Sequence, residues 1–147
     1  MLAGVAVAAP RAAHAQVQVS QLSDVSFGAI ASLSSDQVKS QSICAFAGVL
    51  GGRYSVTASG SGTNNAFTLS NGSATLPYEV QWNASAGQSS GTNLTTGTPL
   101  TGQTMVLSCP ITAATNVSLI VILRGTALTT ATAGAYTGTL SVLLTAN

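Results

Sequence analysis

The chain has 147 residues, of which 46% are hydrophobic and only 5% are charged, and its formal net charge is +1. This length is typical of one domain. Disordered chains combine low hydrophobicity with high net charge, and this composition has neither property. Binding to nucleic acids or anionic membranes depends on clustered Lys and Arg, which the sequence lacks. The composition therefore predicts a folded domain and excludes electrostatic binding of both kinds.

The N-terminus resembles the end of a secretory signal peptide. A short apolar run over residues 2–9 precedes Ala13-His14-Ala15, a small-x-small sequence that predicts cleavage before Gln16. The basic segment that normally opens a signal peptide is missing. We therefore expect residues 1–15 to be a signal peptide truncated at its start, and residues 16–147 to be the exported domain. A buried N-terminal helix is the alternative, because the run is too short to cross a bilayer.

Export would remove His14, which is the single histidine of the chain. A Ser-His-Asp triad and a histidine-activated cysteine both need this residue type, and a zinc site needs more ligands than two distant cysteines. Three carboxylates remain, from Asp24, Asp36 and Glu79, and a pair of them could serve glycoside hydrolysis. They lie on three separate segments, so we interpret them as solvated surface charges. The sequence thus predicts no enzyme activity, no cofactor and no metal site.

Two cysteines, Cys44 and Cys109, remain in the exported chain. An even number of cysteines in an exported protein predicts a disulfide, and two cysteines allow only one intramolecular pairing. Closing this loop would stabilise the fold by about 4 kcal/mol in the chain-entropy model. Two buried thiols and a cross-link between subunits are the alternatives.

Short strands separated by turn sequences account for most of the chain, which has no helix-period segment of useful length. Asn71-Gly72 is the strongest hairpin signal. The polar stretch 83–103 predicts long loops with one short strand near Leu94, and the glycines of 48–52 predict a hairpin loop. The predicted strands are residues 17–27, 43–46, 53–59, 75–82, 105–109, 117–123 and 136–145, with one more strand around Phe67 and Leu69.

The apolar residues of these strands indicate how the strands pack. Residues 117–123 are apolar on both faces, which is typical of a central strand, and the last strand places Tyr136, Leu140, Val142 and Leu144 on one inward face. Pro77 cannot donate to a ladder, so its strand lies at an edge or begins irregularly. Regularly spaced strands without intervening helices predict a single antiparallel β-sandwich with Ig-like topology.

Three aromatic residues, Tyr54, Tyr78 and Trp82, have two interpretations. They could form a platform for sugars, or they could belong to the core of the sandwich. Tyr78 and Trp82 fall in register with Leu76 and Val80, which favours the core.

Four segments together resemble the spore coat U domain family, which includes subunits of archaic chaperone–usher pili. They are LSDVSFG at 22–28, GRYSVT at 52–57, TLPY at 75–78 and GAYTGTLSVLLT at 134–145. The resemblance runs from about Val17 to Asn147. Its most specific element is the closing G-x-Y-x-G/D-T sequence followed by alternating hydrophobic residues.

The resemblance implies an Ig-like sandwich that lacks its last strand, with the strand of Tyr136, Leu140, Val142 and Leu144 bordering the resulting groove. In the family a periplasmic chaperone first fills this groove, and an N-terminal strand of the next subunit then replaces it by strand addition. The expected function is therefore a structural subunit of a secreted surface fibre (pilus) or coat. The expected partners are the chaperone, the usher, neighbouring pilin subunits and further copies of the chain, and the expected route leads through the periplasm to the cell surface.

The sequence departs from the family in two ways. Residues 17–27 contain no cysteine, although family members usually carry one there. Cleavage before Gln16 leaves only residues 16–19 as a donor segment, which is short for the roughly ten residues that a strand needs to cross a sandwich. We therefore expect either a subunit at a fibre terminus, which receives a strand without donating one, or a stand-alone relative of the pilins. The alternative function is a secreted or tip-located adhesive module that binds through loops 60–66 and 83–103.

Overall fold

Ten β-strands form in the part of the chain that the computed structural model describes, residues 17–47, 53–104, 109 and 114–147. A 3-10 helix at Thr63–Asn65 and the short helix α1 at Gly125–Leu128 accompany them. The strands are β1 (Val17–Ser20), β2 (Gln37–Ala47), β3 (Arg53–Gly60), β4 (Thr68–Ser70), β5 (Thr75–Pro77), β6 (Glu79–Asn83), β7 (Thr92–Asn93), β8 (Leu100–Thr104), β9 (Val117–Leu123) and β10 (Leu140–Ala146).

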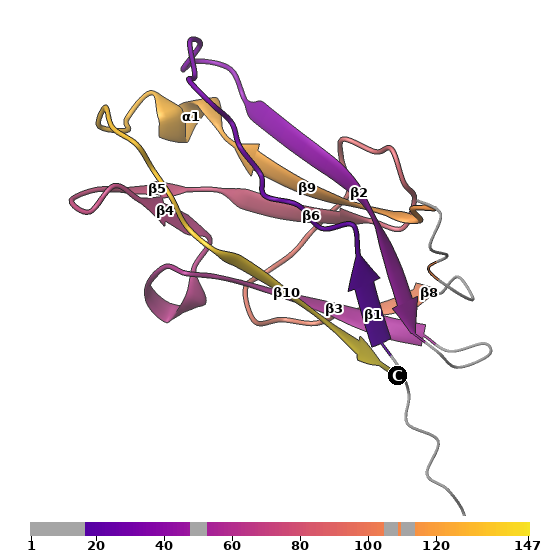
Figure 1. Ribbon diagram of the computed structural model, residues 1–147. Coiled ribbons are helices and arrows are strands. Elements are labelled where there is room, and N and C mark those ends of the chain that lie inside the picture. The colour runs from indigo at the N-terminus through magenta and orange to yellow at the C-terminus, as the bar shows by residue number, and fades with distance from the viewer. Residues whose placement is uncertain (1–16, 48–52, 105–108, 110–113) are drawn as a thin grey trace, which may run out of the picture.

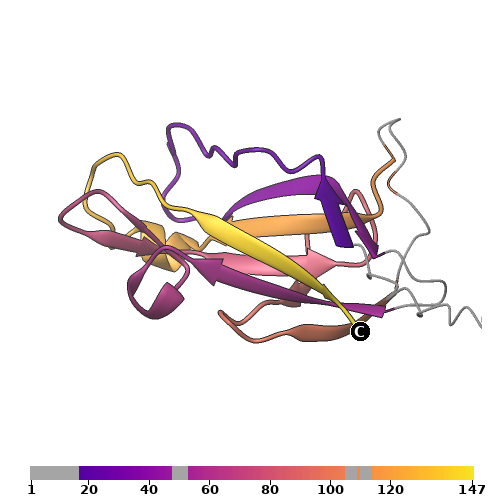
Figure 2. The same ribbon diagram turned by 60° about the horizontal axis from the view of Figure 1, so that its bottom comes forward.

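The strands form the two layers of an antiparallel β-sandwich (Figures 1 and 2). One layer is a five-stranded sheet in the order β1-β2-β9-β6-β7, and the other is a three-stranded sheet in the order β10-β3-β8. The hairpin β4-β5 forms a separate two-stranded sheet. All strand pairs are antiparallel. The predicted all-β fold is therefore confirmed.

β9 lies at the centre of the larger sheet, as its sequence VSLIVIL predicts. All of its residues are buried, because β2 and β6 flank it and both of its faces are covered. Its inner-face side chains pack against those of β3 in the opposite sheet, where Tyr54, Val56 and Ala58 are fully buried. Both strands were correctly predicted, because the apolar residues of a buried strand are enough to identify it in the sequence.

The three aromatic residues belong to this core. Tyr54, Tyr78 and Trp82 are all buried, and the Tyr54 and Trp82 rings meet edge to face with their centroids 6.4 Å apart. This is a favourable geometry for an aromatic pair. The interpretation of Tyr78 and Trp82 as core residues is confirmed, and these buried rings offer no platform to a sugar.

Several predicted strand limits were wrong. The first strand ends at Ser20 instead of residue 27, and β2 begins at Gln37, well before the predicted residue 43. The predicted strand 75–82 is split at Tyr78 into β5 and β6, which agrees with the irregularity expected at Pro77. β8 was missed inside a stretch predicted mainly as loop. The loop 48–52 and residues 105–108 of another predicted strand lie outside the described residues.

The last strand was also predicted too long, and the structure gives the reason. β10 begins at Leu140 instead of residue 136, because the chain before it pairs elsewhere. Thr137 forms an isolated bridge with Ser70, with Ser70 N to Thr137 O at 2.8 Å and Thr137 N to Ser70 O at 3.0 Å. The segment that leads into β10 is therefore held by β4 and not by β3.

The hairpin β4-β5 turns at Asn71-Gly72, as predicted. The Asn71 side-chain oxygen accepts hydrogen bonds from the backbone N–H groups of Ser73 at 3.0 Å and Ala74 at 2.7 Å. Gly72 has a φ of 95°, a value that favours glycine. The side chain of Asn71 thus builds the turn from within.

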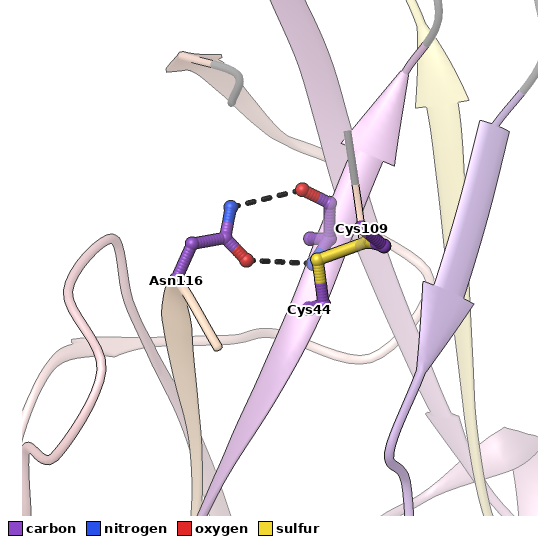
Figure 3. The surroundings of a disulfide bond; sticks show 4 residues. Cys44, Cys109 and Asn116 are labelled. Atoms are coloured by element: carbon purple, nitrogen blue, oxygen red, sulfur yellow. Dashed lines mark hydrogen bonds between the residues drawn. A yellow bond between two sulfur atoms is a disulfide. The ribbon is translucent and has the colours of Figure 1, made fainter. Parts of the chain in front are cut away.

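A disulfide joins Cys44 of β2 to Cys109 (Figure 3), with the two Cα atoms 5.7 Å apart. This is the predicted pairing. The disulfide attaches Cys109 to the strand that pairs with both β1 and β9.

Candidate functional site

A groove of about 1080 Å³ lies along one side of the sandwich, between the chain segments 22–30 and 131–142. The first segment connects β1 to β2, and the second leads into β10 and includes its first residues. Figure 1 shows residues 22–30 and 131–139 as long connections without strands or helices. The groove is bounded by parts of the chain that are distant in sequence and that belong to opposite layers.

The floor of the groove is the interior of the sandwich itself. It is formed by the inner-face residues Leu119, Val121 and Leu123 of β9, with Leu76 and Leu128 beside them. All five belong to the hydrophobic core. The groove therefore reaches the core directly, which is unusual for a complete sandwich because its two sheets cover each other.

β10 and the residues before it form one wall. Tyr136, Leu140 and Val142 line the groove and are half-buried, whereas Leu144 is buried beyond its end. β10 pairs with β3 on one side and, among the described residues, has no strand on the other. This wall thus combines apolar side chains with an unpaired strand edge.

The alternation along β10 separates two adjacent leucines. Leu143 is 63% exposed on the outer face of the strand, whereas Leu144 is 7% exposed on the inner face. The inward face predicted for Leu140, Val142 and Leu144 therefore has the expected register, because side chains alternate across a strand.

Segment 22–30 forms the opposite wall, and it carries apolar residues that remain in contact with water. Leu22 and Val25 of this segment, and Leu33 just after it, are among the most exposed large hydrophobic residues of the described chain, and all three line the groove. Phe27 and Ile30 are half-buried beside them. Sequence reasoning placed the first part of this segment in a strand and missed Ile30 and Leu33, since neither belongs to an alternating pattern.

One end of the groove is closed. β1 lies close to β10 there (Figures 1 and 2), and Val19 packs against the core. The walls of the groove carry exposed apolar residues, among them Leu22 and Val25. The groove is therefore a partly open core.

Three charged residues meet at the ends of the three inner strands of the five-stranded sheet. Arg124 donates to Asp36 at 2.7 Å and to Glu79 at 2.6 Å, and the Gly125 N–H donates to Asp36 at 2.9 Å. The sheet order places the ends of β2, β9 and β6 side by side, so residues from three distant segments become neighbours. The sequence-based interpretation of Asp36 and Glu79 as separate solvated charges was therefore wrong, although both side chains remain half-exposed.

The charges of this cluster stabilise one another. The hydrogen bond from Gly125, followed by that from Arg124, holds the pKa of Asp36 below its ordinary value of 3.8. The hydrogen bonds with Glu79 and then Asp36 raise the pKa of Arg124 above its usual range. One guanidinium engages both carboxylates, so the cluster keeps one net negative charge, and its charge-assisted hydrogen bonds suit a structural role. Asp24 lies apart from the cluster and lines the groove.

The described residues contain no group of His, Cys, Asp and Glu side chains that could hold a metal ion. Within the same part of the chain, no helix has the length and apolar character needed to cross a membrane.

Loop 84–91, part of the stretch considered for adhesion, packs onto the outer face of the five-stranded sheet. Gly87 N donates to Ser42 Oγ at 2.9 Å, and Gln88 N donates to Ser118 Oγ at 2.9 Å. Ser118 Oγ in turn donates to the Ser85 carbonyl at 2.8 Å. Serine hydroxyls of β2 and β9 therefore fasten this loop to the sheet, which leaves fewer of its polar groups free for a ligand.

Comparison with known proteins gives one match. The family model of the Spore Coat Protein U domain matches residues 3–143, nearly the whole chain. No curated protein and no solved structure matches the sequence. The chain belongs to the spore coat protein U domain family.

Proposed function

We propose that this chain is a structural subunit of a secreted surface fibre or coat, and that an extended segment of a neighbouring subunit fills its groove. Membership of the family indicates a pilus- or coat-type subunit. The observation that carries the finer proposal is the groove, with its core residues as a floor and the unpaired edge of β10 as a wall. An unpaired strand edge is a template for another strand.

The chemistry of the groove favours an apolar strand as its occupant. An added strand would bond to β10 through its backbone and would direct every second side chain toward the floor. The floor and walls offer mainly aliphatic and aromatic surface, with Asp24 as the one charged residue among the described lining residues. Alternate apolar side chains would therefore be buried, and the residues between them would face water.

The same exposed surface explains why a subunit of this kind would need protection before assembly. An open groove with an unpaired edge promotes aggregation. We propose that residues 1–15 direct export and that a periplasmic chaperone then covers the groove. An usher would next assemble residues 16–147 into the growing fibre. A structural role of this kind requires no catalysis.

The experiment compares residues 16–147 alone with the same residues carrying a donor strand after Asn147. The donor has about ten residues with Val or Ile at alternate positions, joined through an Asn-Gly turn so that it runs antiparallel to β10. The unfused protein should aggregate or be degraded, and the fused protein should be a monomer with one cooperative unfolding transition.

The matched control has a donor of the same composition shifted by one residue, because this shift turns the apolar side chains away from the groove. It should not rescue the protein. Cooperative, reversible unfolding of unfused monomeric residues 16–147 would mean that the sandwich is already complete, and the strand-addition proposal would then be abandoned.

A further inference from the structure

The pairing register of β1 and β2 extends beyond the point where the ladder ends. Val17 pairs with Ala47 and Ser20 with Cys44, so the same register would place Ser23 opposite Gln41. The ladder stops because Gln21 has a φ of 67°, in the left-handed region, and the chain turns away from β2 there. Ser23 nevertheless remains opposite Gln41.

The side chain of Gln41 bridges the gap that opens at this position. The Ser23 N–H and Oγ donate to Gln41 Oε1 at 2.9 and 3.0 Å, and Gln41 Nε2 donates to the Ser23 carbonyl at 3.2 Å. A primary amide offers the same C=O and N–H groups as a peptide. Gln41 therefore pairs with Ser23 as a backbone peptide would, but from the end of a side chain and so farther from β2.

This contact determines which backbone groups of the wall stay free. Residues 22–28 run without a turn or bend, and successive peptide groups of an extended chain point to opposite sides. Because Ser23 directs its N–H and C=O toward β2, those of Leu22 and Asp24 point away from β2. Within the described part of the chain no hydrogen bond engages them. All three residues line the groove.

We infer that Gln41 is a positioning residue, whose amide holds segment 22–26 away from β2 as a second backbone edge for the strand that fills the groove. This inference rests on the proposed function. Without the amide, no hydrogen bond among the described residues would hold Ser23 at this distance from β2. The wall would then move out of reach of the added strand, which would bond to β10 alone.

The test is residue-resolved amide hydrogen exchange by NMR, in the protein filled by the strand fused after Asn147. The amides of Leu22 and Asp24 should exchange at least about tenfold more slowly in the filled wild type than in the filled Gln41→Leu variant. The protection that the added strand gives to β10 should be the same in both. The control is Gln103→Leu, because within the described residues the amide of Gln103 bonds only to the carbonyl of Thr101 in its own strand.

A second variant covers the case in which Gln41→Leu does not fold. Gln41→Glu keeps an acceptor for the Ser23 N–H but removes the donor to the Ser23 carbonyl, and protection at Leu22 and Asp24 should be intermediate. Equal protection in the wild type and in the variants would show that Gln41 does not position the wall. Rapid exchange at Leu22 and Asp24 in the filled wild type would show pairing with β10 alone. A fused strand that protected neither wall would instead overturn the proposed function.

Discussion

Asn116 pairs with Ala45 through its side-chain amide, next to the disulfide of Cys44 (Figure 3). Asn116 Oδ1 accepts from the Ala45 N–H at 2.8 Å, and Nδ2 donates to the Ala45 carbonyl at 2.9 Å. The Asn116 N–H also donates to the Ile43 carbonyl at 3.0 Å. Asn116 lies one residue before β9, and its side-chain amide replaces a backbone partner for β2. On the other edge of β2, the side-chain amide of Gln41 likewise replaces a backbone partner for Ser23.

The first prediction concerns this pairing. Asn116→Ala should lower the free energy of unfolding by about 1–3 kcal/mol, because Ala45 is fully buried and its N–H and C=O would lose their partners. Asn83→Ala is the control, since the amide of Asn83 makes two hydrogen bonds that water can replace. Denaturant unfolding of the strand-filled protein measures both variants. Equal losses would mean that the ladder does not need Asn116.

The second prediction concerns the disulfide. Cys44→Ser or Cys109→Ser should lower the free energy of unfolding by about 4 kcal/mol, because the open chain regains loop entropy when it unfolds. Reduction of the wild type should have a similar effect. Mass spectrometry of the unreduced protein should find no free thiol, and two free thiols would reject the bond.

The third prediction uses the adjacent leucines of β10. Leu144→Asp should prevent folding, because it would bury an unpaired charge in the core. Leu143→Asp should be tolerated, because this side chain is 63% exposed. Circular dichroism and the yield of soluble strand-filled protein distinguish the two. Comparable damage from both substitutions would contradict the register of β10 against β3.

The features that were predictable from the sequence are those decided by neighbouring residues. The apolar faces of β9, the alternation of Tyr54, Val56 and Ala58 in β3, and the Asn71-Gly72 turn each need only a few consecutive residues. The features that were missed depend on long-range pairing. Thr137 pairs with Ser70 of β4, so β10 begins later than its sequence pattern predicts. The sheet order brings Asp36, Glu79 and Arg124 together from distant segments.

The groove was predictable only in part, for the same reason. The β10 wall follows from an alternating pattern, and the family resemblance assigns such a strand to a groove. The opposite wall was wrongly predicted as a strand as far as residue 27. Local alternation cannot reveal that Gln21 takes a positive φ, or that Gln41 replaces a backbone partner with its side chain.

The fourth prediction concerns pH. Because the pKa of Asp36 is lowered in the folded state, the ion cluster should stabilise the protein above pH 3.8, the ordinary value, and this contribution should disappear as the pH falls through the lower folded pKa. The effect should be modest, since all three side chains are half-exposed. Asp36→Asn should remove this pH dependence from denaturant midpoints measured between about pH 2 and 5. An unchanged pH profile in Asp36→Asn would show that the cluster contributes nothing.

The fifth prediction tests the exposed wall of the groove with two valines of similar exposure. Val25 is 38% exposed and lines the groove, whereas Val38 is 43% exposed on β2 and does not line it. Filling the groove should bury Val25 and leave Val38 in contact with water. Val25→Lys should therefore destabilise the strand-filled protein by about 2 kcal/mol or more, from the lost apolar burial and the cost of covering an ammonium group.

Val38→Lys should change the stability of the same protein by less than about 0.5 kcal/mol, as is usual for a surface substitution. The measurement is the denaturant midpoint of the two filled variants, with Val25→Ala as an intermediate case that removes methyl groups without adding charge. If Val25→Lys and Val38→Lys behaved alike, the added strand would not cover segment 22–30. The occupant would then contact only the β10 side of the groove.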